Sequence, residues 1–159
     1  MDELIGLLRE AGITILVDVR AFPSSKRHPQ FAKSSLEMAL SERGIRYRWE
    51  GKSLGGFRKP EINSLNVALN SEGLNGYADY MRSREFAAAI SGVSELASKS
   101  KIAIMCAERD PLQCHSSLIS DYLTVRGVKV SHIIETDVTQ THRPNTLVRE
   151  IGENLVYDR

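Results

Sequence analysis

Two cysteines, a glutamate and a histidine follow one short apolar run, and together these residue types could perform thiol chemistry. The run 101–106 has the length and composition of a buried strand, and apolar side chains recur at helical spacing after His115. Cys106, Glu108, Cys114 and His115 therefore lie in a strand-to-helix turn. In open parallel sheets such turns lie at the carboxyl ends of the strands, where ligands usually bind. We predict that these four are catalytic residues.

The position of Cys114 at the expected start of a helix favours a reactive thiol. Free backbone amides and the positive end of the helix dipole stabilise a thiolate there. Adjacent residues do not face the same way, so the partner of His115 could be either Cys114 or Cys106. Glu108 could orient the histidine or transfer a proton itself.

Other roles for the cysteines stay open. Free cysteines are often buried as small apolar residues, and Cys106 ends an apolar run. The loop could also fold back to join Cys106 and Cys114 in a disulfide. Zinc bound by both cysteines and His115 fits less well, because structural zinc sites usually have four ligands and the chain has no C-x2-C or H-x3-H pair. We therefore expect no metal and no cofactor.

A second polar group follows the strongest strand signal, the run 13–20. Asp18 and Arg20 are two residues apart, so they share one face of this strand and could form an ion pair or contact a ligand jointly. The basic, hydroxyl-rich loop 22–31 comes next and contains Arg27, which could contact an anion or remain in solvent. We predict Asp18, Arg20 and Arg27 as ligand-binding residues.

Length and composition limit the class of protein. The 159 residues suit one domain spanning 1–159, and a formal net charge of +1 gives no general attraction to nucleic acid or anionic membranes. No apolar run reaches the roughly twenty residues that cross a bilayer, and no signal peptide opens the chain. Two cysteines without a disulfide framework favour a reducing compartment. We expect a soluble, cytoplasmic protein with no membrane partner and an unknown oligomeric state.

Helical and strand patterns alternate along the chain. The periodicity predicts helices at 2–11, 34–43, 84–98 and 116–127, and strands at 13–20, 45–50, 101–106 and 128–135. Residues 51–76 have no clear period and are expected to form a long surface loop, a type that is often functional. The alternation predicts a single-domain, three-layer α/β fold, with a mainly parallel sheet of about four to five strands and helices on both faces.

Three segments resemble a known family. They are VDVRAFPSS with the downstream HPQF, LGGFRKP followed by NGYADYM, and IMCAERDPLQCHSSLISDYL followed by VSHIIE. In order and spacing they are similar to the family known as domain of unknown function 488, over about residues 13–142. The resemblance implies a compact cytoplasmic α/β domain of bacteria or archaea and implies little about activity.

The resemblance also implies a set of site residues and shows where this chain departs. To the residues already named it adds Gly55, Gly56 and Tyr77 as ligand-binding candidates. Family members usually have an arginine after the Cys-His pair, where this chain has Ser116. The family also tends to begin with an additional strand, and this chain opens directly in the first expected helix. The first strand of the family is therefore expected to be missing here.

The residues favour an enzyme. Cys114 or Cys106 would be the nucleophile, with His115 and Glu108 in proton transfer, acting on a small anionic or nucleotide-like ligand. A looser similarity to rhodanese-like domains suggests a further alternative, sulfur transfer or cysteine phosphatase chemistry centred on Cys106.

The alternative from a different class is a non-catalytic nucleotide or nucleic-acid binding module. Basic and aromatic residues interleave over 46–59, and such residues contact phosphates and stack on bases. The basic members are Arg27, Arg46, Arg48, Lys52, Arg58 and Lys59, and the aromatic members are Tyr47, Trp49 and Phe57. The same alternation is also ordinary for a half-buried strand.

Overall fold

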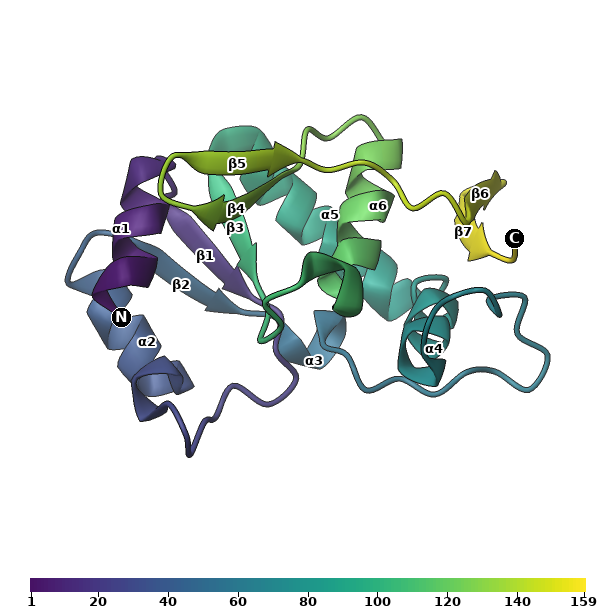
Figure 1. The fold of residues 1–159 in the computed structure, drawn as a ribbon, viewed down its shortest axis with the longest axis horizontal. Coiled ribbons are helices and arrows are strands. Elements are labelled where there is room, and N and C mark those ends of the chain that lie inside the picture. Colours follow the sequence, from purple (N-terminus) through teal and green to yellow (C-terminus); the bar gives the residue numbers. More distant parts are fainter.

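The central element of the fold is a short parallel sheet. The computed structural model describes residues 1–159 and places three strands in the order β2-β1-β3 (Figure 1). They are β1 (Ile15–Asp18), β2 (Arg46–Trp49) and β3 (Ile102–Met105). All four residues of β1 are buried, because this strand has a neighbour on each side and helices on each face. The sheet therefore holds β1 and β3 side by side in parallel.

Helices cover both faces of the sheet, as the pattern predicted. The helices are α1 (Asp2–Glu10), α2 (Lys33–Ser41), α3 (Gly51–Leu54), α4 (Glu72–Tyr80), α5 (Arg84–Lys99) and α6 (Ser116–Val125). Short 3-10 turns span Pro29–Phe31 and Pro111–Gln113. The four helices expected from periodicity are present to within two residues at each end. Figure 1 shows α1 and α2 on one side of the sheet and α5 and α6 on the other.

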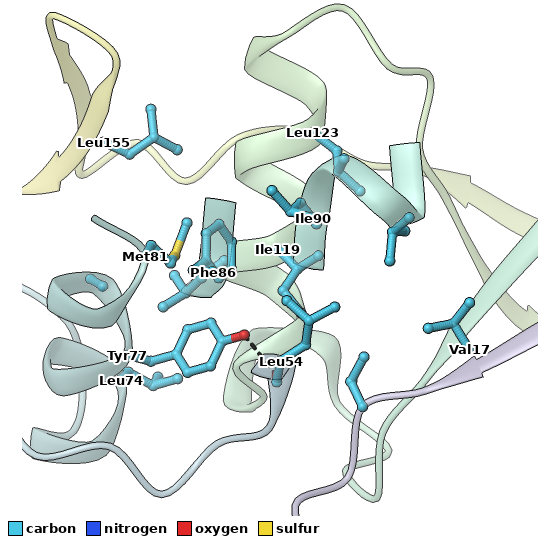
Figure 2. Packing of buried hydrophobic residues seen from close by; sticks show 14 of the residues in the cluster. Val17, Leu54, Leu74, Tyr77, Met81, Phe86, Ile90, Ile119, Leu123 and Leu155 are labelled. Atoms are coloured by element: carbon cyan, nitrogen blue, oxygen red, sulfur yellow. Dashed lines mark hydrogen bonds between the residues drawn. The ribbon is translucent and has the colours of Figure 1, made fainter. Parts of the chain in front are cut away.

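Two apolar cores follow from the alternation of side chains along β1. Ile15 and Val17 face the larger core, which α4, α5 and α6 complete, and Figure 2 shows Tyr77 and Phe86 at its centre. Leu16 points to the opposite face and packs in the smaller core with side chains of α1 and α2. Successive strand residues point to opposite faces, so this strand anchors both layers.

Two antiparallel hairpins complete the chain. They pair β4 (Ser131–Glu135) with β5 (Val138–Thr141), and β6 (Val148–Ile151) with β7 (Asn154–Tyr157). The second hairpin packs against α4, and its last residues, Leu155, Val156 and Tyr157, are buried. The C-terminal hairpin is therefore part of the folded domain.

The prediction of about four to five mainly parallel strands was wrong. The parallel sheet has three strands, and β4 pairs only with β5 in a separate sheet. A tight turn with Asp137 at φ 59° reverses the chain immediately after β4, so an antiparallel partner forms locally.

The expectation of a structureless loop at 51–76 was also wrong in part. The segment contains α3 and the start of α4, a helix with low intrinsic propensity because it includes two glycines. The side chain of Ser71 accepts a hydrogen bond from the Leu74 N–H and caps α4. A Cβ at Gly76 would lie 2.3 Å from the Arg58 carbonyl oxygen, so this glycine permits the helix to pack directly on backbone.

Candidate active site

The two strong strands end at the same edge of the sheet. Because β1 and β3 are adjacent and parallel, with Asp18 opposite Met105, the residues that follow each strand emerge together. Arg20 and Cys106 therefore lie at one edge of the sheet. The turn from Cys106 leads into α6, whose first residue is Ser116.

Both cysteine sulfurs lie close to one imidazole. The Sγ of Cys106 is 3.8 Å from Nδ1 of His115, and the Sγ of Cys114 is 3.7 Å from the same nitrogen. All three atoms lie within 4.8 Å of one another, and both cysteines are free thiols. Cys106 and Cys114, which are eight residues apart in sequence, are thus brought together with His115. We call these three residues the thiol–imidazole cluster.

The two sulfurs differ in exposure and in acidity. A hydrogen bond from the Cys106 thiol lowers the pKa of Cys114 to about 4, and the imidazole of His115 and the Ser116 N–H assist. The same hydrogen bond, together with burial, raises the pKa of Cys106 far above its usual range. Cys114 is 3% exposed, whereas Cys106 is only partly buried. The cluster therefore holds a buried thiolate beside a more accessible thiol.

Backbone amides also face the accessible sulfur. The N–H groups of Ala107 and Glu108 hydrogen-bond toward Cys106 and oppose the rise of its pKa. The Ser116 N–H is 3.5 Å from the sulfur of Cys114. Negative charge is therefore stabilised on either sulfur by fixed dipoles, which is the arrangement that activates cysteines.

Glycines and an aromatic ring form the wall around His115. A Cβ at Gly56 would lie 3.1 Å from Nδ1 of His115, and a Cβ at Gly55 would lie 2.9 Å from Cα of Ala21. The ring of Tyr77 lies 4.8 Å from the imidazole, centroid to centroid. Segment 51–76, predicted as a loop, thus supplies one side of the site. Nε2 of His115 is buried and has no hydrogen-bond partner.

Tyr77 closes this wall rather than offering its hydroxyl to the site. The side chain is fully buried, and its hydroxyl donates a hydrogen bond of 2.7 Å to the Leu54 carbonyl (Figure 2). Burial raises its pKa well above the usual range, so the phenol stays protonated. Its ring is tilted by 54° relative to the imidazole of His115.

Asp18 and Arg20 form a buried brace at the sheet edge. The carboxylate of Asp18 accepts hydrogen bonds from Nε and Nη2 of Arg20 at 2.9 and 2.7 Å, and from the Tyr47 hydroxyl at 2.6 Å. Nη2 of Arg20 also donates to the Phe31 carbonyl. The pair links β1 to β2 and to the following loop, and these contacts occupy the groups expected to bind a ligand.

Glu108 and Arg27 lie apart from the hydrogen bonds of the cluster. Both side chains are exposed, and neither forms a hydrogen bond or ion pair. Glu108 contributes its backbone amide to Cys106. The side chains in contact within the cluster are therefore the two cysteines and His115.

The aromatic residues interleaved with basic ones are largely engaged inside the fold. Tyr47 bonds to Asp18, and the indole N–H of Trp49 donates to the Arg20 carbonyl at 2.9 Å. Strand β2 alternates exposed and partly buried residues, as a half-buried edge strand does. Of the three aromatic residues in this stretch, Phe57 alone is fully presented to solvent.

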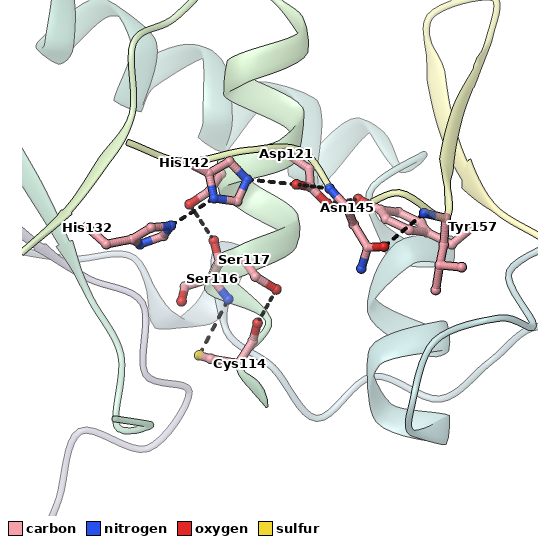
Figure 3. Close-up of polar contacts among 10 residues, drawn as sticks. Cys114, Ser116, Ser117, Asp121, His132, His142, Asn145 and Tyr157 are labelled. Carbon is pink, nitrogen blue, oxygen red and sulfur yellow. Dashed lines mark hydrogen bonds and ion pairs between the residues drawn. The ribbon is translucent and has the colours of Figure 1, made fainter. Parts of the chain in front are cut away.

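The structure also contains a series of hydrogen-bonded, largely buried polar side chains that the sequence did not indicate (Figure 3). Asp121 accepts a hydrogen bond from Nε2 of His142 at 2.7 Å, and Nδ1 of His142 lies 2.8 Å from Nε2 of His132. The hydroxyl of Tyr157 donates to the second oxygen of Asp121 at 2.8 Å. These residues join α6 to both hairpins, and no pattern in the sequence indicated that they meet.

No helix combines the length and apolar character needed to cross a membrane. Comparison with curated proteins and with solved structures gave no match. The family model described as "Domain of unknown function DUF488" matches residues 1–123, which include β1, β3 and the complete thiol–imidazole cluster. The match covers well over half of the 159 residues, so the chain belongs to this family.

Proposed function

We propose that the protein is a thiol-dependent enzyme whose nucleophile is Cys106. The observation that carries the proposal is the convergence of an accessible thiol, a buried thiolate and an imidazole within 4.8 Å at the carboxyl edge of the sheet. A nucleophile needs access to substrate, and a base needs a position next to the proton that it takes. Cys106 meets the first condition and Cys114 the second.

The proposed step is nucleophilic attack with internal proton transfer. The Cys106 sulfur forms a bond to an electrophilic atom of the substrate while its proton passes to the Cys114 thiolate. The leaving group departs with the bonding electron pair and takes a proton from Cys114 or His115. Amides of Ala107 and Glu108 lie beside the reacting sulfur and can stabilise negative charge that develops there.

The substrate class follows from the same dipoles. An anionic or strongly polarised group is the natural partner of amides directed into the site. The proposed substrate is a small molecule that carries such a group next to its electrophilic atom. Arg27, exposed on the loop after β1, would attract it from solvent.

Site-specific alkylation tests this proposal. Iodoacetamide added at neutral pH should label Cys106 rapidly in the folded protein, and peptide mass spectrometry identifies the labelled sulfur. Cys106→Ser should abolish the rapid phase, while Cys114→Ser should leave a slow, strongly pH-dependent label on Cys106. Slow labelling of both thiols in the folded wild-type protein contradicts the proposal.

The geometry also favours a second candidate, a soft-metal centre. In a tetrahedral zinc site the ligand atoms lie about 3.3 to 3.8 Å apart, given zinc–ligand bonds of about 2.0 to 2.3 Å. The two sulfur–nitrogen distances here, 3.7 and 3.8 Å, fall at that spacing. The sequence spacing had made such a site unattractive, but the fold brings the three donors together.

Metal titration distinguishes the two candidates. Bound Co²⁺ should give strong thiolate charge-transfer absorption that Cys106→Ser and His115→Gln both weaken. For a metal centre, zinc should co-purify at one ion per chain and block alkylation until a chelator removes it. Rapid alkylation of the protein as purified, with no bound metal, supports the enzyme.

A further inference from the structure

Two phenylalanines next to the thiol–imidazole cluster are presented to solvent. Phe22 is 72% exposed and Phe57 is 84% exposed, yet their rings lie 5.6 Å apart with an angle of 56° between their planes. Large aromatic side chains are normally among the most buried parts of a domain. An exposed, paired arrangement leaves ring faces free for a ligand.

The backbone at Phe57 is held in an unfavourable conformation. Its φ of 62° lies in the left-handed region, where a side chain with a Cβ is sterically disfavoured. The only other non-glycine residue in that region is Asp137, in a hairpin turn where aspartate is common. Strained residues of this kind concentrate at ligand sites.

The two rings belong to segments that build the wall of the site. Gly56 precedes Phe57 and packs against Nδ1 of His115. Gly55 packs on Ala21, the residue before Phe22. Because consecutive Cα atoms are about 3.8 Å apart, the backbone of Phe57 is within about 9 Å of the imidazole. The backbone of Phe57 therefore lies near His115, and its ring pairs with that of Phe22.

We propose that Phe22 and Phe57 form an aromatic clamp: because their centroids are only 5.6 Å apart, a planar ring of the substrate stacks on their exposed faces and not between them. The inference rests on the proposed function, because the ring group would be part of the molecule that Cys106 attacks. The tilted pair offers apolar faces, and neither ring carries a polar group that would prefer water. The substrate class is thus an electrophile attached to an aromatic or heteroaromatic ring.

Matched electrophiles test the clamp. Labelling rates of Cys106 are measured with chloroacetamide, N-butylchloroacetamide and N-(1-naphthylmethyl)chloroacetamide, each divided by its rate with glutathione. The normalised labelling rate should be about tenfold higher for the naphthyl compound than for chloroacetamide, which is a typical effect of one stacking contact. The increase for the butyl compound should be clearly smaller. Phe22→Ala and Phe57→Ala should remove this gain and leave the parent rate within about twofold.

Two further variants separate the ring from the backbone. Phe57→Gly keeps the left-handed conformation without strain, so it should lose the naphthyl preference without lowering the melting temperature. Ile62→Ala removes another fully exposed apolar side chain and should change neither rate. A preference that survives both phenylalanine variants, or an equal gain with the butyl compound, overturns the clamp. Failure of chloroacetamide itself to label Cys106 overturns the proposed function instead.

Discussion

Replacement of Cys114 by serine is the sharpest test of the proton exchange between the two sulfurs. In the wild-type protein the pKa of Cys114 is about 4, so the cluster already carries one negative charge near neutral pH. Attack by Cys106 then requires its proton to move to the adjacent thiolate, an uphill transfer that bond formation to the reagent has to drive. The alkylation rate of Cys106 should therefore be nearly constant between about pH 6 and 8, because neither sulfur titrates in that interval.

The variant removes both the base and the charge. Cys106 then ionises alone, and a free thiol with a pKa of about 8.5 is only about 1% thiolate at pH 6.5. The rate in Cys114→Ser should rise about tenfold for each pH unit over this range, whereas the wild-type rate should stay nearly constant. The change of the logarithm of the rate with pH is more informative than the absolute rate, since it does not depend on the intrinsic reactivity of the reagent.

The assay is stopped-time labelling with iodoacetamide followed by peptide mass spectrometry, at several pH values and constant ionic strength. Circular dichroism of the variant provides the control for folding. The reasoning is refuted if the wild-type rate follows a single ionisation near the free thiol value. It is also refuted if the label falls on Cys114, because the nucleophile would then be the buried sulfur.

Three other perturbations test the surrounding structure. Burial, and then the neighbouring His142, lowers the pKa of His132. Below about pH 6.5 the unfolded chain therefore binds a proton that the folded chain does not, and the stability of the fold decreases as the pH is lowered. His132→Gln should reduce the resulting loss of melting temperature between about pH 7.5 and 5.5. Asp18→Ala leaves Arg20 without its buried partner and should cost about 3 to 5 kcal/mol in urea unfolding, against about 1 kcal/mol for Tyr47→Phe. Gly55→Ala places a Cβ 2.2 Å from the Gly51 carbonyl oxygen and should cost about 2 kcal/mol or more, measured by thermal unfolding, whereas Gly6→Ala meets no atom within 4 Å and should be neutral or stabilising.

Local sequence patterns determined the elements of the core and the position of the cysteines. Apolar spacing predicted α1, α2, α5 and α6 and the three parallel strands, because each presents a regular apolar face to one of the two cores. Residue types placed Cys106 after a strand and Cys114 at a helix start, as observed. The helices, the strands and the positions of the cysteines within them depend on residues that are close in sequence, so local patterns are enough to predict them.

Tertiary structure decided what each side chain does. Asp18 and Arg20 form the ion pair that their spacing allowed, and Tyr47 from the neighbouring strand, which the sequence did not indicate, completes the brace. The chain from Asp121 through His142 to His132 joins three separate elements, and no local pattern links residues so far apart in sequence.

The difference in exposure between the two sulfurs was likewise decided by packing. Helix-start amides predicted an acidic Cys114, and its pKa is indeed lowered, yet its sulfur is almost completely covered. Cys106, which ends an apolar strand, is the more accessible of the two. Exposure depends on which distant segments cover a side chain, and local sequence patterns do not contain that information. Residue type and spacing therefore indicated which side chains could react, and long-range packing determined which of the two sulfurs is accessible.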